Sequence, residues 1–165
     1  MITKNIKNNN RNLSLAIKAV KNCIRLLKKK VPKIKKSIIG REVKLNLDEK
    51  LNKIIIDSLK TSEIPIISEE KSINENNYII NNKKSFWIID PLDGSLNYLR
   101  GIPMSTVSIS LIVNNKPKIS IIYEIFKNDI YLAYKNNILL NNKKIKVNRK
   151  FIKKKNGILA TRIST

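Results

Sequence analysis

The sequence predicts an α+β protein in which two helices pack on a largely antiparallel sheet. Apolar residues recur at helical spacing over residues 13–27 and again over residues 48–59. Farther along, short apolar or alternating runs are separated by Asn-rich turns, a pattern typical of strands joined in hairpins. Because helices come first and consecutive strands follow, most strands should pair with their neighbours in sequence.

The two predicted helices differ in how they begin. Residues 1–12 are polar and rich in Asn and Lys, and we expect a frayed terminus there. The first helix follows, with one apolar stripe formed by Leu13, Ala16, Ile17, Val20, Ile24 and Leu27. The second begins near Asp48, which can serve as its N-cap, and its apolar face comprises Leu51, Ile54, Ile55 and Leu59.

Short strands are predicted on both sides of a polar segment. The apolar runs 64–67 and 86–89 indicate buried strands, and the Asn- and Lys-rich segment 71–84 between them predicts a loop, interrupted by the apolar residues 78–80. The later strands comprise a hairpin (106–112 with 118–123) and two short runs, 130–134 and 144–147. A length of 165 residues fits one domain, which we assign to residues 13–165.

The composition excludes several kinds of site. Cys23 is the only cysteine, so no internal disulfide can form, and this fits a cytoplasmic protein. The chain has no His, which rules out Cys/His zinc sites and Ser-His-Asp catalysis within it. It also lacks a run of eighteen apolar residues, so we expect no membrane span. Any metal would be held by oxygen, which favours Mg²⁺.

The formal charge of +22 suggests nucleic acid as a partner, but the pattern does not favour it. Lys, Ile and Asn are spread along the chain rather than gathered in one module. These residues have A- and T-rich codons, so genome composition accounts for the bias. Aromatic residues make up only 5% of the chain, too few for an evident stacking platform.

The second buried strand ends in two carboxylates, Asp90 and Asp93. Pro91 lacks an N–H group and should stop the strand, although Asp-Pro and Asp-Gly pairs are also common in turns. Gly94 permits a tight turn, and Ser95 can cap a short helix after it. Carboxylates hold a hard cation and helix-start N–H groups hold an anion, so the arrangement predicts a site for a metal-bound phosphate.

A second acidic pair follows the strand predicted over residues 64–67. It consists of Glu69 and Glu70. Four of the twelve acidic residues of the chain therefore follow two apolar strands. Such clustering is not expected of scattered surface acids, and it strengthens the prediction of a metal site.

Residues 90–98, Asp-Pro-Leu-Asp-Gly-Ser-Leu-Asn-Tyr, resemble the signature of the inositol monophosphatase family. The resemblance continues through 101–103 and 107–111, includes the acidic motif at 66–70, and places Asp48 at the helix-capping Asp of the family. It implies the layered α/β sugar-phosphatase fold, of which this chain would be the N-terminal half. Family members are about a hundred residues longer, within the usual range of domain sizes.

The resemblance also implies a role for each residue of the motif. The ligands of Mg²⁺ would be Glu69, Asp90, the Leu92 carbonyl and Asp93. Asp48 and Ser95, which stands where the family usually has Thr, would orient and activate a metal-bound water. That water would attack a phosphate monoester in line. The phosphate would be bound at Asp93, Gly94 and Ser95.

The function implied is Mg²⁺-dependent hydrolysis of inositol 1-phosphate or a similar small phosphate monoester. Asn97-Tyr98 resembles the inositol-phosphate branch, and the alternative substrate is 3′-phosphoadenosine 5′-phosphate. Either the gene is truncated, or the remainder is on another chain, or the sequence is a fragment. A truncated, inactive remnant with non-specific anion or RNA binding is therefore a further alternative. A homodimer is left open.

Overall fold

The computed structural model describes residues 10–28, 36–39 and 42–146. Its helices are α1 (Arg11–Lys28), α2 (Asn46–Leu59), the 3-10 turn η1 (Lys60–Ser62), α3 (Ile73–Asn82) and α4 (Ser95–Arg100). Its strands are β1 (Lys36–Ile39), β2 (Glu42–Leu45), β3 (Ile66–Ser68), β4 (Ser85–Asp93), β5 (Thr106–Val113), β6 (Lys116–Glu124), β7 (Asp129–Tyr134), β8 (Asn137–Leu140) and β9 (Lys143–Lys144).

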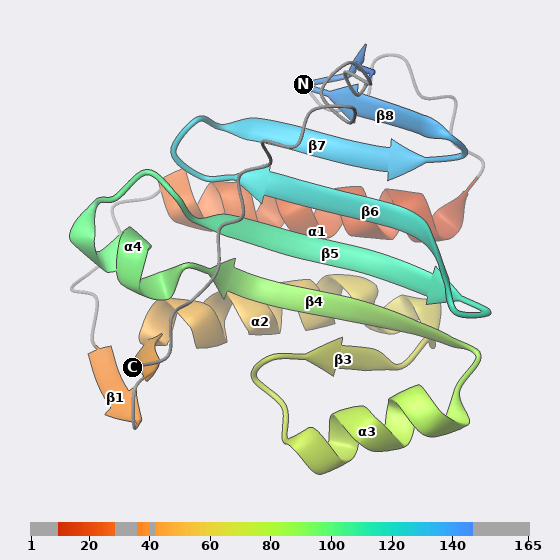
Figure 1. The fold of residues 1–165 in the computed structure, drawn as a ribbon, viewed down its shortest axis with the longest axis horizontal. Helices are drawn as coiled ribbons and strands as arrows, with labels where there is room; N and C mark the ends of the chain where they lie inside the picture. Colours follow the sequence, from red (N-terminus) through yellow and green to blue (C-terminus); the bar gives the residue numbers. More distant parts are fainter. Residues whose placement is uncertain (1–9, 29–35, 40–41, 147–165) are drawn as a thin grey trace, which may run out of the picture.

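Seven of the strands form one sheet in the order β3-β4-β5-β6-β7-β8-β9 (Figure 1). Only β3 and β4 run parallel, and every later neighbour is antiparallel. β1 and β2 pair separately as an antiparallel hairpin. The predicted α+β class and the largely antiparallel sheet are confirmed.

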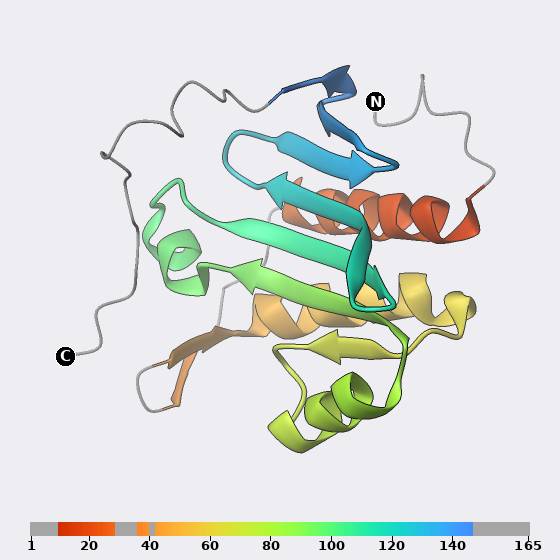
Figure 2. The same cartoon turned by 45° about the vertical axis from the view of Figure 1, so that its right-hand side comes forward.

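The helices α1 and α2 lie side by side against one face of the sheet (Figures 1 and 2). Strand residues on that face are buried with them, as the alternation of β5 shows for Val107, Ile109 and Leu111. On the opposite face, Ile88 and Ile122 are 41% and 42% exposed. The core is therefore one helix–sheet layer that holds β4, and the acidic residues at its end, in place.

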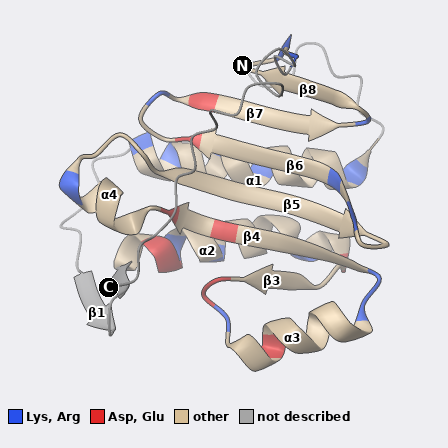
Figure 3. Cartoon of the chain, viewed as in Figure 1, with Lys and Arg blue, Asp and Glu red and all other residues tan. Residues whose placement is uncertain are grey.

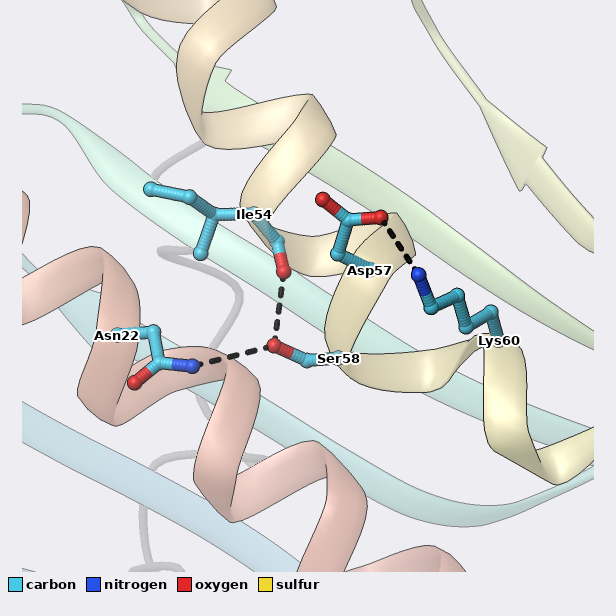
Figure 4. A network of polar contacts seen from close by, with 5 residues as sticks. All are labelled: Asn22, Ile54, Asp57, Ser58 and Lys60. Atoms are coloured by element: carbon cyan, nitrogen blue, oxygen red, sulfur yellow. Dashed lines mark hydrogen bonds and ion pairs between the residues drawn. The ribbon is translucent and has the colours of Figure 1, made fainter.

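A small polar network joins α1 to α2 (Figure 4). The Asn22 amide donates to Ser58 Oγ at 3.3 Å, and that hydroxyl donates to the Ile54 carbonyl at 2.8 Å. The two helices are thus joined by a hydrogen bond at Ser58, which is buried. The neighbouring Asp57–Lys60 ion pair is exposed and should contribute little to stability.

The single thiol should be unreactive in the folded protein. Cys23 lies in the α1 core, fully buried, and burial raises its pKa to about 12. Since thiolate is the reactive form, we expect a thiol-specific disulfide reagent to label the chain only after unfolding. Labelling kinetics with and without denaturant test this. Rapid stoichiometric labelling of native protein would contradict the packing of α1.

The predicted loop at 71–84 was wrong, because residues 73–82 form helix α3. A capping box starts it: the Glu75 N–H donates to Ser72 Oγ, and the Ser72 N–H donates to the Glu75 carboxylate. This Ser-x-x-Glu pattern is visible in the sequence. The Asn-rich composition outweighed it in the prediction.

Strand boundaries also differ from the prediction. β4 does not stop at Pro91, since Asp90 pairs with Ser108 and Asp93 pairs with Thr106 after a register shift. Pro91 lies within this irregularity, where a missing N–H costs no ladder hydrogen bond. β8 was not predicted, and the strand expected over 144–147 is the two-residue β9. α1 begins at Arg11, two residues earlier than expected.

Some expectations lie outside the described residues, among them the frayed terminus over 1–9 and the domain's end after residue 146. Within the described ranges, none of the helices combines the length and apolar character needed to cross a membrane.

Candidate active site

The parallel pairing of β3 with β4 brings two acidic residues together. Ser68 is paired with Ile89, so Glu69, which follows β3, and Asp90, the next residue of β4, come together at the same end of the two strands. Figure 3 shows acidic segments at the start of α2, after β3 and at the end of β4 in one part of the fold. The sequence predicted both acid-ended strands, and the parallel register explains why their acids meet.

The pKa of Asp90 is strongly raised in its position near Glu69 and Asp93. Its pKa is raised from 3.8 to about 7, first by burial and then by the negative charges of Glu69 and Asp93, while a backbone hydrogen bond from Leu92 offsets part of the effect. Its Oδ1 atom is shielded from solvent and receives no hydrogen bond from the described residues. Such an oxygen is costly to bury unless another group, such as a cation, satisfies it.

Ser95 links the β4 end to α2. Its hydroxyl lies 3.0 Å from Asp48 Oδ1 and 2.9 Å from the Leu92 carbonyl oxygen, both within donating distance. Asp48 is only 3% exposed, within the first turn of α2. The capping roles predicted for these two residues were therefore wrong: α2 begins at Asn46, and Gly94 is the N-cap of α4. The structure joins them to each other instead.

The turn between β4 and α4 requires glycine at position 94. Gly94 has a φ of 79°, and a Cβ atom there would lie 2.6 Å from the Met104 carbonyl oxygen. Two side chains brace the turn: Ser105 Oγ donates to the Gly94 carbonyl at 2.9 Å, and the Asn97 amide donates to the Met104 carbonyl at 2.9 Å. Sequence reasoning missed this brace, since Ser105 carries no local signal.

The remaining predicted residues occupy the rim of the cluster. Glu69 and Asp93 are exposed, whereas Leu92 is buried with its carbonyl facing the Ser95 hydroxyl. Glu70 is half-buried, and its N–H donates to Ser68 Oγ at 3.2 Å. The structure thus groups the predicted residues in two linked sets: Glu69, Asp90 and Asp93; and Leu92, Ser95 and Asp48.

The chemistry of these residues fits Mg²⁺. In the described part of the chain, no three His, Cys, Asp or Glu side chains stand close enough to form a ready-made metal cage. Mg²⁺ does not need one, because it usually takes one or two carboxylates and keeps several waters. The Asp90 Oδ1 without a hydrogen bond and the second lone pair of the Leu92 carbonyl supply oxygens of the required kind.

Fold and site together define an α+β protein whose acidic centre lies where two parallel strands end, beside a glycine turn. A family model described as the inositol monophosphatase family matches residues 8–165. The chain belongs to the inositol monophosphatase family, and the resemblance of its motif is confirmed.

Individual relatives carry several names. Nus factor SuhB of Xylella fastidiosa (strain Temecula1 / ATCC 700964) is 38% identical over 109 residues, which are 64% of this chain and 38% of that protein. The 3′(2′),5′-bisphosphate nucleotidase CysQ of Buchnera aphidicola subsp. Acyrthosiphon pisum (strain APS) is 42% identical over 80 residues, 48% of this chain and 29% of that one. The names leave the particular substrate open.

Solved structures share the fold. The extragenic suppressor protein suhB from Bartonella henselae matches with a TM-score of 0.72 and 25% identity, over 85% of this chain and 55% of that chain. An IMPase/NADP phosphatase complexed with Mg²⁺ and phosphate matches with a TM-score of 0.70 and 20% identity, over 79% and 51% of the two chains. The present chain therefore spans about half of these structures, and less of the curated relatives.

Proposed function

We propose that this chain is a Mg²⁺-dependent phosphomonoesterase of the inositol-monophosphatase type. The observation that carries the proposal is Asp90, a carboxylate destabilised by Glu69 and Asp93, with an oxygen that receives no hydrogen bond from the described residues. Membership of the family supports the same chemistry. The half-buried Ser95 hydroxyl, which contacts the buried Asp48 carboxylate, lies next to it through Leu92.

Each residue has a proposed part in the reaction. Glu69, Asp90, Asp93 and the Leu92 carbonyl would hold Mg²⁺, which when bound neutralises the phosphate and the alkoxide that leaves. When the Ser95 hydroxyl donates to Asp48, its oxygen lone pairs can accept a hydrogen bond from the attacking water and orient it. Asp48 is then the group able to take up the proton.

The phosphate would be held at the turn before α4. The residues proposed for this are Asp93 and the backbone N–H groups of Gly94 and Ser95, where a side chain on Gly94 would collide with the Met104 carbonyl. Close approach of backbone to ligand is a common reason for glycine at such a place. The brace from Ser105 and Asn97 keeps the turn fixed for this role.

We propose inositol 1-phosphate as the substrate, on the Asn97-Tyr98 sequence and the family name. A second candidate is 3′-phosphoadenosine 5′-phosphate, because the 42% identical Buchnera relative is a 3′(2′),5′-bisphosphate nucleotidase. Both are small phosphate monoesters, and the same hydrolytic residues would serve either one.

Phosphate release from the two substrates tests the proposal. We expect the purified chain to release phosphate with Mg²⁺ and not with EDTA, and to turn over inositol 1-phosphate faster than the nucleotide. Ser95→Ala should lower the rate by about 10²–10⁴-fold, the contribution of a positioned proton-transfer group. Ser95→Thr should retain activity because it keeps the hydroxyl.

Ser14 on α1 is the matched control, since it is an exposed serine and its substitution by Ala should leave the rate unchanged. A preference for the nucleotide would reverse the substrate assignment. Absence of release from folded protein, or equal activity of Ser95→Ala and Ser14→Ala, would overturn the proposed function of the chain on its own.

A further inference from the structure

We propose that Asn76, on helix α3, is a positioning residue that sets the place of Glu69. The inference rests on the proposed function, in which Glu69 is one of the carboxylates that hold Mg²⁺. It assigns a role to α3, the helix that was predicted as a loop. It also names a residue that the family motif does not contain.

The contact is a two-point clamp on the residue before Glu69. The Asn76 amide nitrogen donates to the Ser68 carbonyl at 2.8 Å, and the Ser68 N–H donates to Asn76 Oδ1 at 3.4 Å. One side chain thus bonds both main-chain polar groups of Ser68, as a neighbouring strand would. Since Ser68 is fully buried, its polar groups need such partners.

The position of β3 in the sheet explains why a clamp is needed. β3 is an edge strand of three residues, and among the strands of the described residues it pairs with β4 alone. The N–H and C=O of one residue point to the same side of a strand, so both groups of Ser68 face the open edge. A short edge strand with unpaired groups opens easily, and the Asn76 amide closes it where Glu69 follows.

The side chain of Ser68 fixes the same point from the other side. Its hydroxyl donates to Asn52 Oδ1 of α2 at 2.9 Å and accepts from the Glu70 N–H at 3.2 Å. The Lys71 N–H donates to the Ser68 carbonyl at 3.0 Å and closes the turn that carries the two glutamates. Ser68 is therefore held between two helices, with Glu69 directly attached.

α3 contributes almost nothing to the core, so a change on this helix can affect the position of Glu69 without lowering the stability of the fold. None of its residues is buried, and its apolar residues Ile73 and Tyr78 are 76% and 63% exposed. The helix is instead held by its capping box and by the half-buried Asn76. We therefore expect loss of the clamp to move Glu69 without unfolding the sheet.

Calorimetric Mg²⁺ titration of the purified chain tests the inference. Asn76→Ala should weaken Mg²⁺ binding by about 10–100-fold, as loss of residues that support metal ligands commonly does. The matched control is Asn77→Ala, on the same helix and exposed, with no side-chain hydrogen bond within the described residues. Asn76→Asp keeps the acceptor oxygen, loses the donor and adds a negative charge, which alone would strengthen Mg²⁺ binding. Weaker binding by Asn76→Asp would therefore come from opening of the clamp, through loss of the donor and repulsion between the new carboxylate and the Ser68 carbonyl oxygen.

Two further readouts separate the possible failures. Thermal unfolding followed by Trp87 fluorescence should show folded variants with similar midpoints, and amide exchange at residues 69–71 should be faster in Asn76→Ala than in Asn77→Ala. If both alanine variants bind Mg²⁺ equally, the positioning role is overturned. If the wild-type chain binds no Mg²⁺, the proposed function fails, and amide exchange alone decides: equal exchange in the two variants overturns the clamp.

Discussion

Replacing Asp90 by asparagine should abolish Mg²⁺ binding and at the same time stabilise the metal-free protein. The substitution keeps the shape of the side chain but removes a half-buried charge that lies beside Glu69 and Asp93. We expect the free energy of unfolding to rise by about 1–2 kcal/mol at neutral or higher pH, a figure reduced for solvent screening of a partly exposed group. Denaturant unfolding with EDTA measures it.

The gain in stability should depend on pH in a defined direction. The folded state keeps the Asp90 proton up to about pH 7, whereas the unfolded state releases it near 3.8. Wild-type stability from this group is therefore complete below pH 3.8 and is lost as the pH rises to about 7. The advantage of Asp90→Asn should be absent in acid, grow over this window and stay constant above it.

Asp57→Asn is the matched control, because Asp57 is exposed on α2 and forms a surface ion pair with Lys60. It should change stability by less than about 1 kcal/mol and leave Mg²⁺ binding intact. If Asp90→Asn instead destabilises the metal-free chain, the carboxylate is not strained and the argument for a cation at this place loses its main support.

The acidic centre was predictable because its signals are local. Asp90 and Glu69 each follow an apolar run in the sequence, and the two runs form parallel neighbours, so the grouping follows from sequence once the pairing is known. The link between Ser95 and Asp48 was not available in this way. Each is a good capping residue locally, and only the family resemblance assigned them a joint role, which the 3.0 Å contact supports.

The missed features are tertiary. Pro91 obeys a local rule that ends strands, but the β4–β5 pairing resumes after a bulge, where Pro91 and Leu92 lie opposite the single residue Val107. Helix α3 had a local signal at Ser72 and Glu75, yet composition favoured a loop. The Asn76 clamp has no local signal at all, because its partner Ser68 lies eight residues away at the end of an edge strand.

Replacing Gly94 by alanine should be the most damaging change to the turn. The new Cβ would lie 2.6 Å from the Met104 carbonyl oxygen. The residue would also be held at a φ of 79°, which residues other than glycine rarely adopt. Backbone strain and overpacking each cost about 1–3 kcal/mol, so we expect a loss of about 2–4 kcal/mol in the free energy of unfolding. Denaturant unfolding measures the loss, and phosphate release should fall with it, because the turn carries Ser95.

Gly101 provides the control that separates the two causes. Its φ is 70°, nearly that of Gly94, but a Cβ there would meet no atom within 4 Å. Gly101→Ala should therefore show backbone strain alone, about 1 kcal/mol. The difference between the variants isolates the contact of position 94 with the Met104 carbonyl. If both substitutions cost the same, the turn has room for a side chain, and glycine at position 94 is then required for its backbone angle rather than for the close approach of the Met104 carbonyl.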